Sequence, residues 1–389
     1  MPIIDRIAAF HNEMTAWRHD LHAHPELCYE EHRTADLVAA KLTAFGCDVV
    51  TRGVGRTGVV ATIRAGSSPR AIGLRADMDA LPLTELNEFA HRSCHPGKMH
   101  ACGHDGHTAM LLGTARYLAE TRAFDGTAHL IFQPAEEGGA GAKAMIDDGL
   151  FERFPVDAVY SLHNRSGLPV GHFLARSGPT MASVDTFDIV LTGKGAHSAR
   201  PELGIDPIVA AAQTVMALQT IVARQVAALD SAVVSVTQIL GGEAYNIIPE
   251  QVTLRGTIRS YRPETRLRLK QRIREIAEAT AAACGATAHV VIGDGYPALV
   301  NHERETRAAA DAAAEIVGEA NVDRNPEPTM ASEDFSYMLE ARPGAHLFVG
   351  NGEGREHVHH PRYDFNDAVL PFGASYFARL VERELPRRI

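Results

Sequence analysis

The segment over residues 99–107 holds the densest group of side chains that could do chemistry, and it reads MHACGHDGH. Cys102 and His104 within it carry a thiol and an imidazole, which are ligands that a borderline metal ion such as zinc prefers. Gly103 and Gly106 would let the backbone turn tightly around those ligands. A polar loop with exposed histidines is the alternative interpretation, so other parts of the chain must decide between the two.

Two adjacent carboxylates form the second candidate. Glu136 and Glu137 follow a predicted strand over residues 128–133 and precede two glycines, in the sequence FQPAEEGG. One carboxylate of such a pair can bind a metal ion while the other accepts a proton from a water molecule beside it. Because glutamate is usually solvated, an exposed acidic turn is the alternative.

Further candidates stand where predicted strands end. His163 follows a strand over residues 158–162, and Asp77 and Asp79 follow a strand over residues 72–75. A single histidine after a strand more often has a structural role than a metal-binding one. In an open α/β sheet, however, ligands bind beyond the carboxyl ends of the strands, where the glutamate pair also lies. This shared position favours one common site.

A histidine-rich segment near the C-terminus, HVHHP over residues 357–361, adds His359 and His360 as candidate ligands. Its proline fixes the backbone beside them. A surface loop or an incidental metal-binding tract would have the same composition.

Two other kinds of site compete with a metal-dependent hydrolase. A cysteine protease would use Cys102 as the nucleophile and His104 as the base, but a separation of one residue makes that geometry awkward, and the glutamate pair would have no role. A structural zinc site usually combines two halves of the CxxC type and contains no free carboxylates. Both alternatives explain fewer of the candidate residues.

The elements that must position these residues alternate between strands and helices at both ends of the chain. Strands are predicted over residues 59–63, 72–75, 128–133, 158–162 and 345–349, and helices around 37–42 and over 108–118, 303–317 and 368–385. This alternation predicts an α/β fold, an open sheet with helices on both of its faces.

The middle of the chain follows a different order. Strands are predicted over residues 184–191, 233–240, 252–260 and 288–292, and helices over 207–229 and 264–283. This β-α-β-β-α-β order is the ferredoxin-like pattern. We therefore expect a discontinuous catalytic domain, residues 1–180 and 295–389, with an inserted α+β domain, residues 181–294.

The composition limits the classes of function. The 389 residues carry a formal net charge of -10, which argues against a general binder of nucleic acid or of a membrane surface, because either would show a basic field. No run of about 18 apolar residues is present, so no transmembrane helix is expected. Five scattered cysteines do not make a disulfide framework and the first residues lack a secretory signal, so a cytoplasmic location is expected.

Taken together, the motifs resemble those of the M20 metallopeptidase family. They are most similar to its amidohydrolase branch, which includes hippurate hydrolases, N-acyl-amino-acid amidohydrolases and plant auxin-conjugate hydrolases. The matching segments are residues 17–27 (WRHDLHAHPEL), 75–82 (RADMDALP), 99–107, 133–139 (QPAEEGG), 193–198 (GKGAHS), 246–249 (NIIP), 256–259 (GTIR), 332–335 (SEDF) and 361–367 (PRYDFND). The resemblance therefore spans nearly the whole chain.

The resemblance implies a site with two divalent metal ions, either zinc or manganese, with cobalt or nickel also compatible. Cys102 matches the ligand that bridges the two ions. The positions that match the terminal ligands are His104, Glu137, His163 and His359. His360 stands where the family usually has Asn or Ser, and Cys28 stands where Gly is usual.

The resemblance also implies roles around the metal ions. Glu136 matches the general base, and Asp79 matches an acidic residue that supports the site. His197 matches a histidine that reaches the active site of a partner subunit, so a homodimer or homotetramer is implied. Asn246 and Arg259 match positions that hold a substrate carboxylate.

The implied reaction is hydrolysis of the amide bond of a small N-acyl amino acid, which releases a carboxylic acid and a free amino acid. Two other functions remain open from the sequence. The protein could be a dipeptidase or aminopeptidase of the same family, acting on substrates with a free amine. It could instead bind metal without turnover.

Overall fold

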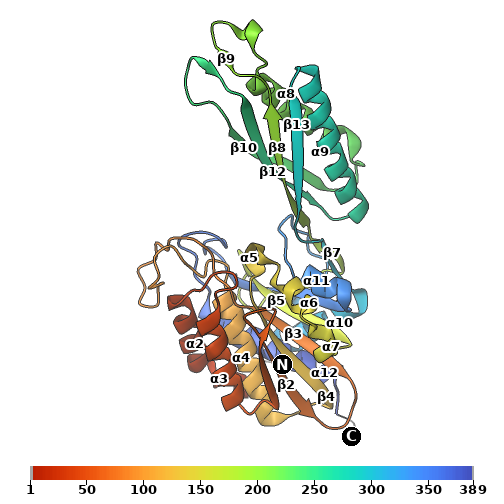
Figure 1. The fold of residues 1–389 in the computed structure, drawn as a ribbon. Coiled ribbons are helices and arrows are strands. Elements are labelled where there is room, and N and C mark those ends of the chain that lie inside the picture. Colours follow the sequence, from red (N-terminus) through yellow and green to blue (C-terminus); the bar gives the residue numbers. More distant parts are fainter. Residues whose placement is uncertain (1–2, 388–389) are drawn as a thin grey trace. The chain divides into compact units, whose positions relative to one another are not determined.

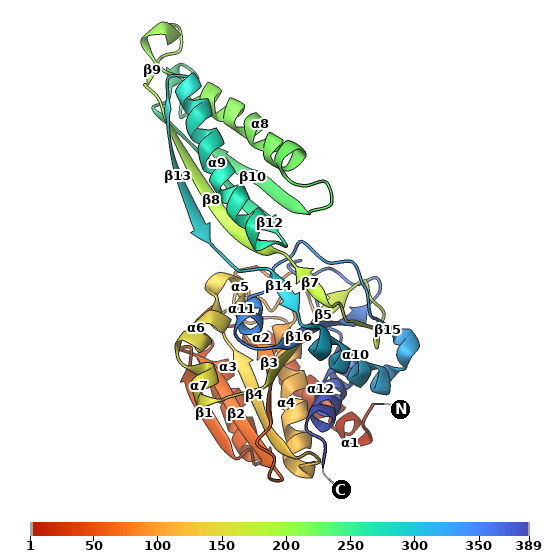
Figure 2. The same ribbon diagram turned by 90° about the vertical axis from the view of Figure 1, so that its right-hand side faces the viewer.

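The structure is a computed structural model that describes residues 3–387, and its chain forms two compact units (Figures 1 and 2). The larger unit contains the residues up to Thr180, the segment Val300–Pro328 and the residues from Asp334 onward. The smaller unit contains Met181–Leu299 and Thr329–Glu333. The predicted insertion, residues 181–294, falls within the smaller unit.

A mixed sheet of eight strands forms the centre of the larger unit. Its strands, in spatial order, are β1 (Val49–Val54), β2 (Gly58–Ala65), β4 (Gly126–Gln133), β3 (Ala71–Asp77), β5 (Ala158–Ser166), β16 (Gly344–Gly352), β6 (Phe173–Leu174) and β15 (Val322–Asp323). The central strands β4, β3, β5 and β16 are parallel, and β2 and β6 run antiparallel to β4 and β16. The predicted α/β sheet is confirmed.

Longer and shorter helices surround this sheet. The longer ones are α2 (His11–Ala23), α3 (His32–Ala44), α4 (His104–Thr121), α10 (Glu303–Val317) and α12 (Leu370–Glu384), and the shorter ones are α1 (Asp5–Ala8), α5 (Glu136–Gly139), α6 (Gly141–Asp147), α7 (Leu150–Arg153) and α11 (Ser336–Ala341). Figure 1 shows α2, α3 and α4 on one side of the sheet and α6 and α7 on the other. In α3 the buried Ala35, Val38, Ala39 and Leu42 follow the i, i+3, i+4, i+7 spacing of an amphipathic helix.

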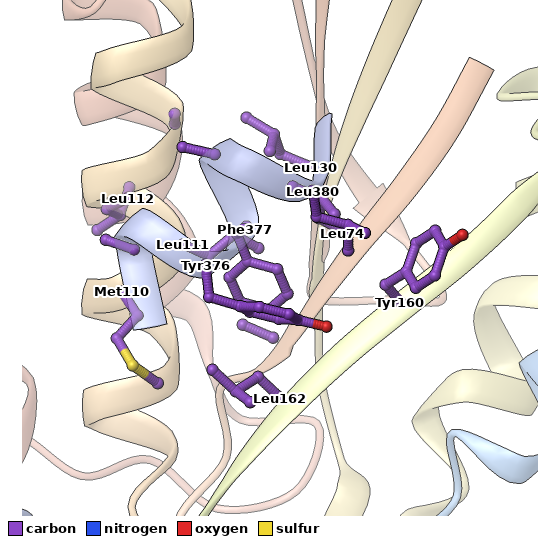
Figure 3. Close-up of a cluster of buried hydrophobic side chains, with 14 of the residues drawn as sticks. Leu74, Met110, Leu111, Leu112, Leu130, Tyr160, Leu162, Tyr376, Phe377 and Leu380 are labelled. Atoms are coloured by element: carbon purple, nitrogen blue, oxygen red, sulfur yellow. The ribbon is translucent and has the colours of Figure 1, made fainter. Parts of the chain in front are cut away.

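Alternation along the parallel strands separates the core from the polar residues. Leu74 and Tyr160 lie in the buried cluster that α4 and α12 also line (Figure 3). Because successive side chains of a strand point to opposite faces, Asp77, Gln133 and His163 lie on the face away from that cluster. The alternation of side chains along each strand therefore places apolar residues in the core and the candidate site residues on the opposite face.

The smaller unit has the predicted β-α-β-β-α-β order, which is thus confirmed. Its main elements are β8 (Ser183–Thr192), α8 (Pro207–Gln225), β10 (Ala232–Leu240), β12 (Gln251–Ser260), α9 (Pro263–Ala283) and β13 (Thr287–Asp294). The strands form an antiparallel sheet in the order β10-β12-β8-β13. The helix predicted over residues 207–229 ends at Gln225, and β7 (Gly178–Met181) and β14 (Leu299–Asn301) stand where the chain passes between the units.

Two short strands extend the ladder between β8 and β12. In the main ladder Thr192 pairs with Gln251. Beyond it, β9 (Ala196–His197) pairs with β11 (Ile247–Ile248), so that His197 stands opposite Ile247. The ribbon of β9 and β11 therefore forms one tip of the smaller unit (Figures 1 and 2).

Helix α8 is the one helix within residues 3–387 that is long and apolar enough to cross a membrane by length and composition, with a mean hydropathy of 1.2. Ala210, Ala211, Leu218 and Ile221 on one of its sides are buried in the core of the smaller unit. This packing is that of a helix that covers a sheet.

Candidate metal centre

A tight turn brings Cys102 and His104 to the start of α4. Gly103 stands between them with a φ of 95°, a left-handed backbone that favours glycine. A Cβ atom at this position would lie 2.3 Å from Asn164 Oδ1 and 2.7 Å from Tyr363 Oη. Glycine is therefore required both for the turn and for the close packing behind it.

Backbone carbonyl groups orient the two histidines of this region. The Nδ1 atom of His104 donates to the carbonyl oxygen of Asp79 over 2.9 Å. The Nδ1 atom of His163 donates to the carbonyl oxygen of Asn164 over 2.7 Å, and its Nε2 atom lies 3.5 Å from Cys102 Sγ. In both rings Nε2 thus remains available to bind a metal ion, as in sites where the second ring nitrogen is held by the protein.

The glutamate pair follows β4 on a loop with an unusual backbone. Ala135, Gly138 and Ala140 all have positive φ angles, of 53°, 88° and 54°. A residue other than glycine costs about 1–2 kcal/mol in this region, so surrounding contacts must stabilise the loop. The two carboxylate oxygens of Asp79 accept the backbone N–H groups of Glu136 and Glu137, each over 2.9 Å.

The two C-terminal candidates, His359 and His360, have different contacts. His359 has a φ of 67° and its N–H donates to the carbonyl oxygen of Ala101 over 2.7 Å. Its Nε2 atom lies 3.1 Å from Glu137 Oε1. His360 instead has Nδ1 at 3.6 Å from Glu356 Oε2. The arrangement thus favours His359 over its neighbour as a ligand.

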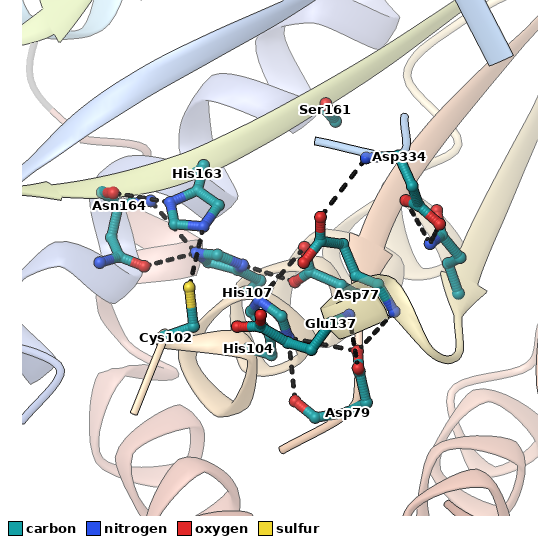
Figure 4. A network of polar contacts seen from close by, with 12 residues as sticks. Asp77, Asp79, Cys102, His104, His107, Glu137, Ser161, His163, Asn164 and Asp334 are labelled. Atoms are coloured by element: carbon teal, nitrogen blue, oxygen red, sulfur yellow. Dashed lines mark hydrogen bonds and ion pairs between the residues drawn. The ribbon is translucent and has the colours of Figure 1, made fainter. Parts of the chain in front are cut away.

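The candidate ligands form two overlapping groups that share one thiol. Figure 4 shows four of these residues, Cys102, His104, Glu137 and His163. The donor atoms of Cys102, His104 and His163 lie within 4.8 Å of one another, and so do those of Cys102, Glu137 and His359. A third group of the same kind joins Glu136 to His104 and Glu137. A thiolate common to two sets of ligands is the arrangement expected of a bridge between two cations.

The pKa shifts of the buried donor residues are compatible with the binding of divalent cations. Burial lowers the pKa of His163 well below its usual value, which leaves the neutral ring that binds metal. Burial raises the pKa of the Cys102 thiol, and the Glu137 carboxylate adds to this effect. A thiolate here therefore needs positive charge beside it. The buried Nε2 atom of His104 has no hydrogen-bond partner among the described residues, as expected of a metal ligand.

Asp77, a candidate from the sequence, lies directly behind the candidate ligands, and it contacts two residues, His107 and Arg75, to which sequence reasoning gave no role. His107 Nδ1 donates to Asp77 Oδ1 over 2.6 Å, and Arg75 Nη1 donates to Asp77 Oδ2 over 2.8 Å. Although burial opposes ionisation, Coulombic interactions with His104, Arg75 and His107 hold the pKa of Asp77 well below its usual value. The period of two places Arg75 on the same face as Asp77, and this signal could have identified Arg75.

A second contact of this network leads to the glutamate pair. Asp334 accepts hydrogen bonds from Gln133 Nε2 over 2.7 Å and from Arg75 Nη2 over 3.1 Å. The backbone N–H of Asp334 donates to Glu136 Oε1 over 3.4 Å. The SEDF motif thus supplies a residue that holds the carboxylate of Glu136, a role that its letters alone did not indicate.

The remaining three predicted residues lie in the smaller unit, and the structure does not bring them together. His197 and Asn246 are exposed at the tip formed by β9 and β11, where the N–H of Ser198 donates to the carbonyl oxygen of Asn246. Arg259 is half-buried and pairs with Val184 at the first residues of β8. Val184 and Thr192 are separated on β8 by about 26 Å at the usual rise of about 3.3 Å per residue, so Arg259 and the tip stand at opposite ends of the sheet.

Chemically, the cluster can hold two cations beside a carboxylate that is not needed as a ligand. When bound, two divalent ions would lower the pKa of a water molecule and polarise a substrate carbonyl. Glu136, which is 7% exposed, lies within the same cluster and could accept a proton from such a water molecule.

Comparisons with known proteins identify the family of this chain. The model of the peptidase family M20/M25/M40 matches residues 73–383. The hippurate hydrolase of Campylobacter jejuni is 42% identical over 388 residues, which cover 99% of this chain and 100% of that protein. The N-acetylcysteine deacetylase of Bacillus subtilis is 39% identical, with 96% of this chain and 97% of that protein covered.

A solved structure extends the agreement to the fold. The crystal structure of a Bacillus subtilis protein, a dinuclear metal binding peptidase from the M20 family, is 36% identical, with 97% of this chain and 99% of that chain covered and a TM-score of 0.84. The resemblance drawn from the motifs is therefore confirmed. This chain belongs to the peptidase family M20/M25/M40, and within it to the amidohydrolase branch.

Proposed function

We propose that this enzyme hydrolyses the amide bond of N-acyl amino acids and releases a carboxylic acid and a free amino acid. The observation that carries the proposal is the adjacency of Glu137, within the group of metal ligands, and Glu136, beside it and held by Asp79 and Asp334. The names of the relatives, a hippurate hydrolase and an N-acetylcysteine deacetylase, support the same class of substrate.

In the proposed mechanism Glu136 acts as the general base and then as the general acid. It accepts a proton from the attacking water molecule and later donates that proton to the leaving nitrogen. Asp79 accepts the backbone N–H of Glu136 and would fix the backbone of this residue, and the N–H of Asp334, which donates to Glu136 Oε1, would keep its carboxylate in one orientation through both steps. Cys102, His104, Glu137, His163 and His359 would hold the two ions.

The chemistry of the ligands narrows the choice of metal. A thiolate and three imidazoles together with one carboxylate suit zinc, which accepts sulfur, nitrogen and oxygen ligands. We propose zinc or manganese as the native ion, with cobalt and nickel as further ions that this site could hold. A cytoplasmic location, which the scattered cysteines indicate, stays a prediction.

We further propose that two copies of the chain complete one active site. His197 and Asn246 stand at one end of the smaller unit's sheet and Arg259 at the other, so one copy cannot place all three on a single substrate. Arg259 in one copy would bind the substrate carboxylate with its planar guanidinium, and Asn246 of the second copy would add an amide donor. His197 of that second copy would stabilise the developing oxyanion.

The surface around the tip supports such a dimer. Strand β10 lies at the edge of its sheet. Its residues Ile239 and Leu240 are 60% and 49% exposed, and Ile247 beside His197 is 56% exposed. Exposed apolar residues next to an open strand edge are typical of a surface that another chain covers. A homodimer is therefore proposed, with a homotetramer as a larger assembly of the same kind.

The dimer leads to a test by subunit mixing. Glu136→Gln and His197→Ala proteins should each be nearly inactive alone, because each lacks one part of every site. Mixed dimers should recover activity, since one of their two sites combines an intact Glu136 with an intact His197. Proven subunit exchange without any recovery would mean that His197 does not act across the dimer.

The proposed substrate class is tested with three matched compounds: an N-acyl amino acid, its C-terminal amide, and the dipeptide with a free amine. The N-acyl amino acid should give the highest kcat/KM. Its C-terminal amide lacks the free carboxylate, and the dipeptide lacks the N-acyl group. Arg259→Ala should reduce kcat/KM for the acid more than for its amide. Preferred cleavage of the dipeptide would favour an aminopeptidase, and no turnover of any compound with zinc, manganese, cobalt or nickel would leave a metal-binding protein.

A further inference from the structure

The loop Ala135–Ala140, which carries both glutamates, is held near its ends by two residues that the proposed reaction does not use. Glu31 Oε1 accepts the N–H of Ala135 over 2.9 Å, although the two residues are 104 positions apart in the sequence. Tyr29 Oη donates to the carbonyl oxygen of Gly139 over 2.7 Å. Both contacts come from the segment just before α3.

Glu31 is itself fixed in one position. Its side chain is fully buried, at 0% exposure. Oε1 also accepts the N–H of Tyr29 over 2.9 Å, and Oε2 accepts the hydroxyl of Thr57 over 2.5 Å. Hydrogen bonds to a carboxylate are stronger than those between neutral groups, so three donors make this side chain a firm anchor.

Glu31 holds Ala135, and the backbone conformation of Ala135 determines the direction of the Glu136 side chain. Ala135 directly precedes Glu136 and has the left-handed backbone that residues other than glycine avoid. Without its hydrogen bond to Glu31, Ala135 would be free to return to a more common conformation. That rotation would move the carboxylate of Glu136 away from its place in the metal centre.

We infer that Glu31 is a positioning residue for Glu136, with Tyr29 securing the other end of the same loop. The inference rests on the proposed function, in which Glu136 is the base. It differs from the role of Asp79, because Asp79 also contacts the ligand His104, whereas Glu31 accepts hydrogen bonds from Tyr29, Thr57 and Ala135. Loss of Glu31 should therefore affect the base and leave metal binding intact.

The test compares Glu31→Ala with Glu31→Gln. Alanine removes the anchor, so kcat should fall about 100-fold, the loss that a misplacement of about 1 Å can cause. KM and the two bound metal ions should be unchanged. Glutamine keeps the shape, since its amide oxygen can accept from Ala135 and its NH2 group can donate to Thr57. It should restore most of the wild-type kcat.

A second measurement does not depend on activity. Amide hydrogen exchange of the peptide that contains residues 135–140 should be faster in metal-free Glu31→Ala than in wild type, and near wild type in Glu31→Gln. The matched control is Glu30→Ala, because Glu30 is exposed and pairs with Lys98 instead of the loop. It should change neither kcat nor exchange.

Several outcomes would overturn the inference. These outcomes are wild-type kcat and exchange in Glu31→Ala, no rescue by glutamine, and loss of metal together with kcat. If Glu31→Ala does not fold, Tyr29→Phe decides, because it removes only the hydroxyl and should still lower kcat and speed exchange of the loop. Failure of the proposed function would look different, since wild type itself would then not cleave N-acyl amino acids.

Discussion

Glu136→Gln is expected to keep two bound metal ions and to lose turnover by about 100- to 10,000-fold, the range for removal of a general acid–base group. Glutamine preserves the shape of the side chain but cannot accept a proton from water at neutral pH. Glu137→Gln should lose metal as well, because Glu137 lies in the group with Cys102 and His359.

The measurement is elemental analysis of each purified variant together with kcat for an N-acyl amino acid. The two glutamates are adjacent and both N–H groups donate to Asp79, so each variant serves as the control for the other. If Glu136→Gln lost metal while Glu137→Gln kept it, the roles of the pair would have to be exchanged.

Removal of the metal ions should reduce turnover to an undetectable level, and two equivalents per chain should restore it. Cys102→Ser should prevent that recovery, because Cys102 belongs to both groups of ligands and a serine hydroxyl is a poor substitute for a thiolate. Cys94→Ser is the matched control, since Cys94 is exposed and its Sγ atom donates to a backbone carbonyl oxygen, that of Ala23. Full activity of a sample shown to be metal-free would contradict this prediction.

Metal binding by the metal-free protein should depend on pH in a defined direction. In the metal-free protein, hydrogen bonds to Cys102 and Glu137 raise the pKa of His359 to about 10. Burial raises the pKa of Cys102 as well. Both groups hold protons at neutral pH that a metal ion must displace, so binding should release protons and metal affinity should rise with pH. Calorimetry in two buffers of different ionisation enthalpy measures that release.

The sequence was sufficient to predict the elements that carry the site, because their signals are local. Strand ends and glycines located Asp77, Glu136 and His163. The order of elements in the smaller unit also followed from its pattern. The end of α8 was placed four residues too late, because the residues after Gln225 remain apolar and carry no helix stop such as glycine or proline.

What could not be predicted depends on residues distant in the sequence. The anchoring of Ala135 by Glu31 and the contact of Asp334 with Glu136 join segments that no local pattern relates. The left-handed backbone of Ala135 was also hidden, because alanine does not favour it. The choice of His359 over His360 rested on the resemblance alone, and the position of Glu137 in space adds support for it.

The place of β16 in the sheet has a consequence for how the protein is made. This strand lies between β5 and β6, and His359 follows it, yet both are synthesised after the whole of Met181–Leu299. At about 5–20 residues per second, the roughly 200 residues from His163 to His359 occupy a ribosome for about 10–40 s. During that time the nascent larger unit has an open edge on β5 and an incomplete set of ligands. We therefore expect the smaller unit to fold first and metal to be acquired only after the chain is nearly complete.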